Sequence, residues 1–209
     1  MTAGALSGEH AMCSAKNTEK IATISVPSAP IAEKRSRAVR RVLTAFPGRF
    51  AAIFWAVSRI ITVGEIQTMS AGTGIFHSEM NASPVEPVEF LQIWIMPRER
   101  NTRPVYQDFN ISELERPNEL AVIVSPDGST PASLLQDAWF SIGKVEAGKK
   151  LGYHTHQSHA GVYIFLIEGE IIVDGEVMKR RDGMGIYDTN NFELETLKDS
   201  HILLIEVPM

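Results

Sequence analysis

The chain has 209 residues, of which 44% are hydrophobic and 22% charged, proportions that are ordinary for a soluble globular protein. This length suffices for one large all-β domain or two small ones. The formal net charge of −5 argues against non-specific nucleic-acid binding by the whole chain. A single cysteine, Cys13, excludes an internal disulfide and fits a reducing compartment.

No part of the sequence predicts a membrane segment. A membrane-spanning helix needs about 20 apolar residues, and the longest apolar run, Ala51–Val57, ends at Ser58. The first residues lack the charged start and apolar core of a secretory signal. We therefore expect a cytoplasmic protein with no membrane partner.

Charge is distributed unevenly along the chain. Residues 1–62 hold nine Lys or Arg and three acidic residues, whereas residues 63–209 hold 11 Lys or Arg and 22 acidic residues. Residues 1–30 are small and polar without a sustained period, which predicts loop or disorder. Residues 31–46 have helical spacing and a basic face. The functional interpretations are a helix that binds a membrane surface or an acidic partner, and a transit peptide, whereas a poorly specified segment is the favoured interpretation.

From Val63 onward the sequence alternates short apolar runs with turn residues, which predicts many short strands and almost no helix. Asp174-Gly175 between two apolar runs predicts a two-residue hairpin. Residues 98–107 are expected to form an exposed loop, in which Arg98, Arg100 and Arg103 either steer an anionic substrate or, as favoured, are simply solvated. The expected strands are Ile66–Met69, Ile75–Met80, Val88–Met96, Leu120–Val124, Trp139–Val145, Val162–Glu168, Glu170–Val173, Gly185–Tyr187, Phe192–Leu197 and Ile202–Val207.

The most specific chemical signal is the pair His77 and Glu79. Side chains at positions i and i+2 of a strand leave the same face, so this imidazole and this carboxylate are expected to point into one interior. Iron, nickel, manganese and zinc all accept mixed nitrogen and oxygen ligands. The pair therefore predicts half of a metal site, with surface residues of no chemical role as the alternative.

The blocks TMSAGTGIFHSE, LQIWIMP and PVYQ, in this order and spacing, resemble the pirin family of two-domain cupins over about residues 63–209. The resemblance implies an all-β bicupin of two jelly-roll-type β-barrels. It gives residues 1–62 as an atypical segment, 63–118 as the remainder of the N-terminal domain, and 119–209 as the C-terminal domain. It also makes His77 and Glu79 two of four metal ligands, with Glu79 a catalytic residue as well.

The chain departs from this family in its first segment. The other two family ligands are a His-x-His pair about forty residues upstream, and residues 25–58 contain no histidine. We therefore expect an incomplete N-terminal barrel. The charge break and the onset of family character at Val63 suggest that residues 1–62 derive from a shifted reading frame or a mis-set start, with a natural degenerate N-terminus as the alternative.

A second histidine cluster lies in GKKLGYHTHQSHAGVYIFLIEG and resembles the general cupin motif. His154 and His156 occupy the histidine places, but Ala160 and Gly161 stand where the motif has glutamate. His159 could complete a three-histidine zinc or copper site, although solvated loop residues are the favoured interpretation. His10 and His201 receive no role, and Trp94 and Trp139 are expected in the core.

The resemblance implies an oxidoreductase of quercetin 2,3-dioxygenase type. A divalent metal, iron (Fe²⁺) by preference, would bind the oxygen of a flavonol-like aromatic substrate for reaction with dioxygen, while Glu79 takes the substrate proton. The missing His-x-His predicts an impaired site. The alternatives are an iron-binding redox or transcriptional co-regulator with a protein partner and no direct contact to nucleic acid, and an inactive remnant.

Overall fold

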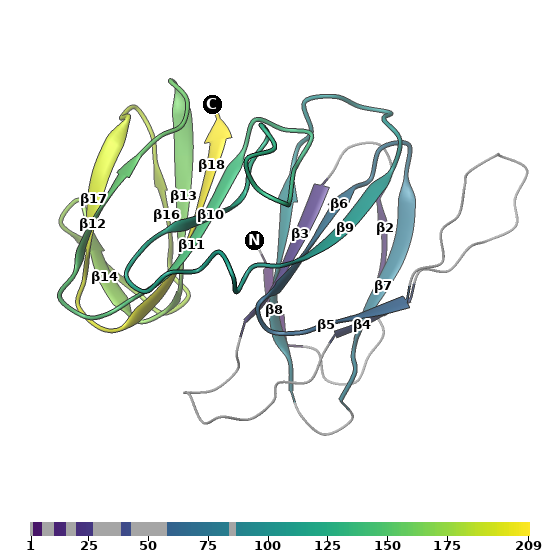
Figure 1. The fold of residues 1–209 in the computed structure, drawn as a ribbon, viewed down its shortest axis with the longest axis horizontal. Helices are drawn as coiled ribbons and strands as arrows, with labels where there is room; N and C mark the ends of the chain where they lie inside the picture. The colour runs from purple at the N-terminus through teal and green to yellow at the C-terminus, as the bar shows by residue number, and fades with distance from the viewer. Residues whose placement is uncertain (1, 6–10, 16–19, 27–38, 43–57, 84–86) are drawn as a thin grey trace, which may run out of the picture. The chain divides into compact units, whose positions relative to one another are not determined.

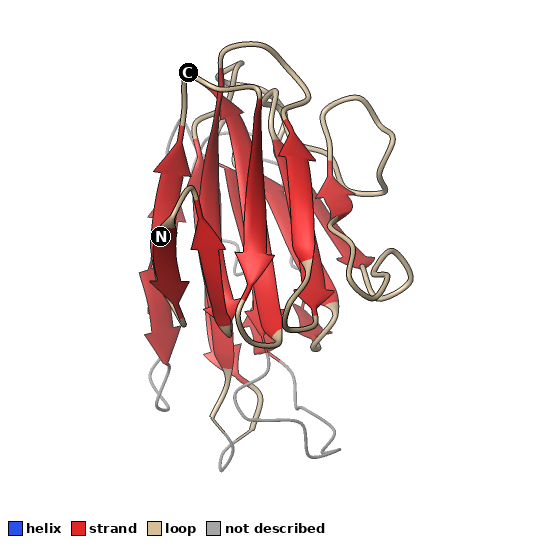
Figure 2. Cartoon of the chain, turned by 90° about the vertical axis from the view of Figure 1, so that its left-hand side faces the viewer, coloured by secondary structure: helices blue, strands red, loops and turns tan. Residues whose placement is uncertain are grey.

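In the computed structural model the described residues are 2–5, 11–15, 20–26, 39–42, 58–83 and 87–209. Their regular secondary structure consists of strands alone, without a helix (Figure 2). The chain divides into two compact units, Met1–Asn110 and Ile111–Met209. No described residue belongs to a helix of the length and hydrophobicity needed to cross a membrane.

The first unit contains a five-stranded and a four-stranded antiparallel sheet (Figure 1). The five-stranded sheet has the order β1-β8-β3-β6-β9, and the four-stranded sheet has the order β2-β7-β4-β5. The strands are β1 Thr2–Ala5, β2 Ala11–Ala15, β3 Lys20–Val26, β4 Val39–Val42, β5 Ser58–Ile61, β6 Glu65–Ser70, β7 Ile75–Asn81, β8 Glu89–Ile95 and β9 Val105–Asn110.

The second unit repeats this pattern, with sheets of order β10-β11-β18-β13-β16 and β12-β17-β14-β15. Its core is the apolar face between the two sheets, where Ile164, Leu166, Leu194 and Leu204 are fully buried. The strands are β10 Ala121–Val124, β11 Trp139–Val145, β12 Lys150–His154, β13 Ala160–Glu168, β14 Glu170–Val173, β15 Glu176–Lys179, β16 Gly183–Ile186, β17 Asn191–Thr196 and β18 Ser200–Pro208.

The all-β cupin fold expected from the sequence is confirmed, and each of the ten expected strands is present with ends shifted by a few residues at most. The predicted hairpin at Asp174-Gly175 is also present, because β14 pairs with β15 across these two residues. Both have positive φ angles, 50° and 80°. This backbone matches the twist of the flanking strands, which is why Asp-Gly is favoured there.

Three expectations about secondary structure were wrong. Residues 2–5, 11–15 and 20–26 are strands rather than loop, and 39–42 is a strand within the segment of helical spacing. Each of these strands pairs with a neighbour from residues 58–95, so long-range pairing overrides the weak local signal. The end of the expected loop at 98–107 belongs to the edge strand β9. The polar residues of this strand are typical of a loop, so the strand was not predicted.

The expected incompleteness of the N-terminal barrel concerns a segment that lies partly outside the described residues, and it stays a prediction. The same holds for the proposed origin of residues 1–62 and for the domain limits drawn at residues 62 and 118. His10 lies outside the described residues.

The hairpin turn gives the first testable prediction. Replacing Gly175 by alanine should lower the free energy of unfolding by about 1 kcal/mol, because a side chain disfavours φ of 80° while the added Cβ meets no atom within 4 Å. Urea denaturation measures the change. Gly152→Ala on β12 is the matched control, because its Cβ also meets nothing, and it should not destabilise the protein. Equal losses in both variants would contradict the backbone explanation.

Candidate functional site

The pair His77 and Glu79 lies on β7, which runs between β2 and β4 in the four-stranded sheet of the first unit. Only 4% of His77 and 5% of Glu79 is exposed. On β2, Cys13 stands opposite His77 in register and Ala11 opposite Glu79. The two side chains share one face of the strand by the two-residue alternation, as the sequence predicted.

A contact between the sheets shows that this face points inward. Gln92 lies on β8, in the five-stranded sheet, and its Nε2 donates a hydrogen bond to Glu79 Oε2 over 3.4 Å. The indole Nε1 of Trp94 in turn donates to Gln92 Oε1, also over 3.4 Å. The carboxylate of Glu79 is therefore held from the opposite sheet, in the interior of the first unit.

The chemistry of the pair fits a divalent metal, since an imidazole nitrogen and a carboxylate oxygen are both accepted by first-row ions. Within the described part of the chain, however, no three histidine, cysteine, aspartate or glutamate side chains are placed to share an ion. The described residues thus supply two donors of such a site. The ligand roles of His77 and Glu79 stay predictions.

Gln92 received no role from the sequence, and its segment Val88–Met96 was predicted only as a strand. The signal was present, because glutamine interrupts the apolar run FLQIWIM and a polar residue on a buried strand needs a partner. Trp94 was expected in the core, yet 37% of it is exposed. Its ring lies at the border of the interior, with the N–H turned to Gln92.

In the second unit the histidine motif surrounds a buried carboxylate, Glu206 of β18, which has no exposed surface. Tyr153 donates its hydroxyl to Glu206 Oε2 over 2.9 Å, and the backbone N–H groups of His156 and Gln157 donate to Oε1 over 2.8 and 3.2 Å. The ring Nδ1 of His156 also lies 2.8 Å from Oε2. Burial and the nearby Glu206 carboxylate raise the pKa of the Tyr153 hydroxyl, which therefore remains a donor.

The three histidines do not form the alternative zinc or copper site, since the described residues contain no such group. His156 is held by Glu206 and stacks on Trp139 with ring centroids 4.9 Å apart and planes 4° from parallel. His154 ends β12 and is exposed, as is His159, which has a φ of 58°. The motif therefore serves a structural contact in this unit.

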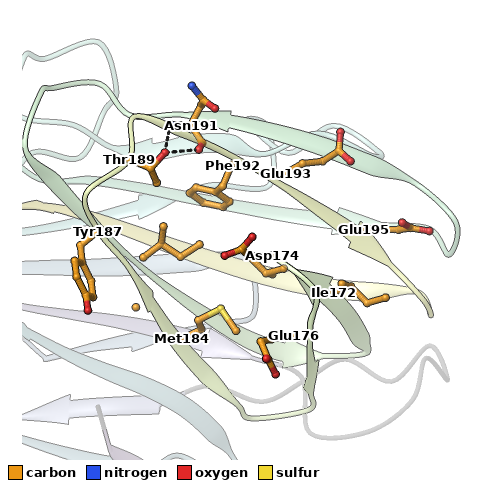
Figure 3. Close-up of a pocket in the computed structure, with 14 residues that line it drawn as sticks. Ile172, Asp174, Glu176, Met184, Tyr187, Thr189, Asn191, Phe192, Glu193 and Glu195 are labelled. Atoms are coloured by element: carbon orange, nitrogen blue, oxygen red, sulfur yellow. Dashed lines mark hydrogen bonds between the residues drawn. The ribbon is translucent and has the colours of Figure 1, made fainter.

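A cavity of about 620 Å³ lies in the second unit between the edge strand β16 and the sheet that contains β14, β15 and β17 (Figure 3). Its wall combines the apolar Met184 and Phe192 with the carboxylates of Asp174 and Glu176 (Figure 3). No histidine of the described residues lines it. Its Asn191 and Phe192 nevertheless pair in register with His154 and Tyr153 of β12, so the cavity adjoins the histidine motif of this unit.

The remaining sequence candidates have simple surroundings. Arg98, Arg100 and Arg103 are exposed in the loop between β8 and β9, as expected. His201, on β18, stands in register with Lys144 on one side and Glu168 on the other. Burial, followed by repulsion from Lys144, lowers the pKa of His201 from 6.5 to about 4, so the ring is neutral at pH 7.

Comparison with known families identifies the chain on the basis of both units. The model of the family named Pirin matches residues 56–95, which include His77, Glu79 and Gln92. The model described as the quercetinase C-terminal cupin domain matches residues 122–207, nearly the whole second unit. The chain belongs to the pirin family of cupins.

Curated relatives agree with this family. The quercetin 2,3-dioxygenase of Escherichia coli K12 is 28% identical over 148 residues, 71% of this chain and 63% of the relative. A Pseudomonas aeruginosa protein, whose assignment as a quercetin 2,3-dioxygenase is provisional, is 32% identical over 146 residues, 69% of this chain and 62% of the relative. The chain spans a little over three-fifths of the length of these curated pirin-family relatives.

Solved structures support the fold. The crystal structure of YhhW from Escherichia coli has a TM-score of 0.80 at 23% identity, covering 97% of this chain and 77% of YhhW. The same bacterial pirin in complex with nickel(II) has a TM-score of 0.79 at 23% identity, covering 99% and 79%. A quercetin 2,3-dioxygenase from Acinetobacter baumannii follows with a TM-score of 0.73 at 18% identity, covering 95% and 67%.

The buried carboxylate of the second unit yields a testable prediction. Replacing Glu206 by glutamine should lower the free energy of unfolding by about 2 kcal/mol. The Tyr153 hydroxyl and the His156 N–H would lose a carboxylate acceptor, and the NH₂ group of the new amide would face one of these donors. Urea denaturation measures this loss.

The matched control for Glu206 is Glu193→Gln, which breaks an exposed ion pair with Lys150 of 3.3 Å. It should cost less than about 1 kcal/mol. If both variants lost the same stability, the cluster around Glu206 would be energetically no different from a surface pair.

His201 predicts a pH dependence of stability. Its pKa is lower in the folded chain than the ordinary 6.5, so the unfolded chain binds the proton more tightly and stability falls as the pH drops from 6.5 toward 4. Lowering the pH from 7 to 4.5 should reduce the free energy of unfolding of both proteins. The reduction should be about 2 kcal/mol smaller for His201→Gln than for the unchanged chain. Equilibrium denaturation at the two pH values measures it. His154→Gln, at an exposed strand end, should keep the pH slope of the unchanged chain, and an unaltered slope in His201→Gln would contradict the assignment.

Proposed function

We propose that this pirin binds a divalent metal through His77 and Glu79 and uses it to oxidise a flavonol-type substrate with dioxygen. The observation that carries the proposal is the buried pair on β7, whose carboxylate is held in the interior by Gln92 from the opposite sheet. An imidazole nitrogen and a carboxylate oxygen on one buried strand face are a donor pair that a first-row divalent cation accepts. Additional ligands would come from other residues or from solvent.

The choice of metal rests on ligand chemistry and on a relative. Nickel(II) is the ion bound in the structurally similar bacterial pirin. A nitrogen and an oxygen donor suit iron equally well, and iron(II) is the ion that we propose for the native protein. Such an ion, when bound, supplies a Lewis acid and a redox partner for the oxygen of an aromatic hydroxyl group.

The residues of this chain contribute binding and proton handling. Glu79 is buried and accepts a hydrogen bond from Gln92 at Oε2. A carboxylate at that place can take the proton of a flavonol hydroxyl. Quercetin is the substrate named in the E. coli relative, and a flavonol of that type is the substrate class that we propose. The site would operate in the cytoplasm.

The proposal predicts that the purified chain carries close to one iron or nickel ion, and that His77→Ala and Glu79→Gln lose it. Removing a ligand should weaken binding by more than the roughly 10- to 100-fold that a supporting residue contributes. Elemental analysis and chelator competition measure the affinity. His159→Ala, an exposed histidine of the second unit, is the control that should retain the metal.

Oxygen uptake with quercetin then separates the enzyme from its alternatives. Uptake by the metal-loaded chain, absent in His77→Ala, is the expected result. Metal binding without uptake would contradict the dioxygenase and favour a non-enzymatic metal-binding co-regulator. A chain that binds no metal under any loading condition would contradict the whole proposal and favour an inactive remnant.

A further inference from the structure

Gln92 is placed by its strand to act on Glu79. The strand β8 presents alternate residues to opposite faces, so that Leu91 and Ile93, exposed by 0% and 4%, lie on one face. Gln92 and Trp94 lie on the other, which faces the four-stranded sheet and Glu79. The glutamine therefore lies between a tryptophan at the border of the interior and a carboxylate inside it.

The orientation of the Gln92 amide follows from the chemistry of its two neighbours. An indole N–H can only donate, and an ionised carboxylate can only accept. The oxygen of the amide must then face Trp94 and its nitrogen must face Glu79. The structure has this orientation, with 3.4 Å from Trp94 Nε1 to Gln92 Oε1 and 3.4 Å from Gln92 Nε2 to Glu79 Oε2. The flipped amide would set a donor against the indole N–H and an acceptor against the carboxylate, so that both contacts would become repulsive.

This arrangement suits a metal ligand better than a charged partner would. Gln92 donates to Oε2 of Glu79 through a neutral amide, so this contact itself adds no positive charge that would compete with a bound cation. A supporting hydrogen bond of this kind fixes the plane of a carboxylate ligand, and loss of such a partner weakens metal binding by roughly 10- to 100-fold.

We propose that Gln92 is a positioning residue that holds Glu79 in its metal-binding orientation, and that Trp94 acts through Gln92 by fixing the direction of its amide. This inference rests on the proposed function, since it requires a metal at His77 and Glu79.

The chain offers a matched control on the neighbouring part of the same sheet. Thr23 of β3 pairs in register with Gln92 on one side and with Gln67 of β6 on the other. Gln67 is more deeply buried, with 1% exposed, and its Nε2 donates to the hydroxyl of Tyr106 and, over 3.2 Å, to Oδ1 of Asp108. The two glutamines thus share one face of the sheet, whereas Gln92 donates to Glu79 and Gln67 donates to residues of β9.

The test measures nickel(II) affinity by chelator competition, and the visible spectrum of the cobalt(II) form, on the full chain. Gln92→Leu should weaken nickel binding by roughly 10- to 100-fold and alter the cobalt spectrum. Trp94→Phe, a mild change at a partly exposed ring, should give a smaller loss. In the Gln92→Leu background Trp94→Phe should have no further effect, because its influence passes through the amide. Gln67→Leu should lower the free energy of unfolding while leaving the nickel affinity and the cobalt spectrum unchanged.

The outcomes separate the two proposals. Nickel binding that His77→Ala abolishes and Gln92→Leu leaves intact would overturn the role of Gln92 alone. A loss in Gln67→Leu as large as that in Gln92→Leu would do the same, since it would show a general effect of packing. Additive losses in the double variant would overturn the role of Trp94. An unchanged chain that binds neither nickel nor cobalt would overturn both the positioning role and the proposed function.

Discussion

A carboxylate buried between two β-sheets must be compensated by donors or by a cation, because an isolated charge in a medium of low polarity is strongly disfavoured. Both units of this protein contain such a group. Glu79 lies on β7 in the first unit and Glu206 on β18 in the second, with 5% and 0% of their surfaces exposed. The hydrogen-bond partners that surround these two carboxylates differ.

Glu206 is satisfied by the protein alone. A hydroxyl, two backbone N–H groups and an imidazole nitrogen surround its two oxygens, all contributed by the segment from Tyr153 to Gln157. This segment includes part of the histidine motif by which cupins are recognised. In this unit, however, His156 points its Nδ1 at the carboxylate and stacks on Trp139. In this unit the motif joins β18 to the end of β12 and the loop that follows it, through hydrogen bonds to Glu206.

Glu79 has a different partner. Gln92 reaches it from the opposite sheet with a neutral donor, and His77 shares its face of β7. The shared strand face of His77 and Glu79 is the reason for proposing the metal site in the first unit.

Much of the fold could be predicted from local sequence, and the reasons are specific. Asp174-Gly175 favours a tight turn whatever surrounds it, because only a few residues tolerate positive φ at both positions. The expected strand Val162–Glu168 was recognisable because all of its residues but the last are apolar. The edge strand β9 was not predicted, because its polar residues are typical of a loop. Its place in the sheet depends on pairing with β6, where Gln67 donates hydrogen bonds to Tyr106 and Asp108. The strands within residues 2–42 were missed because their pairing partners lie far along the chain.

The sequence by itself determined the family, the all-β class and the shared face of His77 and Glu79, because strand alternation and family motifs are local properties. It did not determine that Gln92 would face Glu79, that Trp94 would orient the amide, or that His156 would be bound to a glutamate fifty residues away. Those facts depend on which strands of the two sheets face each other. Only the tertiary structure decides that, since contacts between sheets join residues whose separation along the chain carries no pattern.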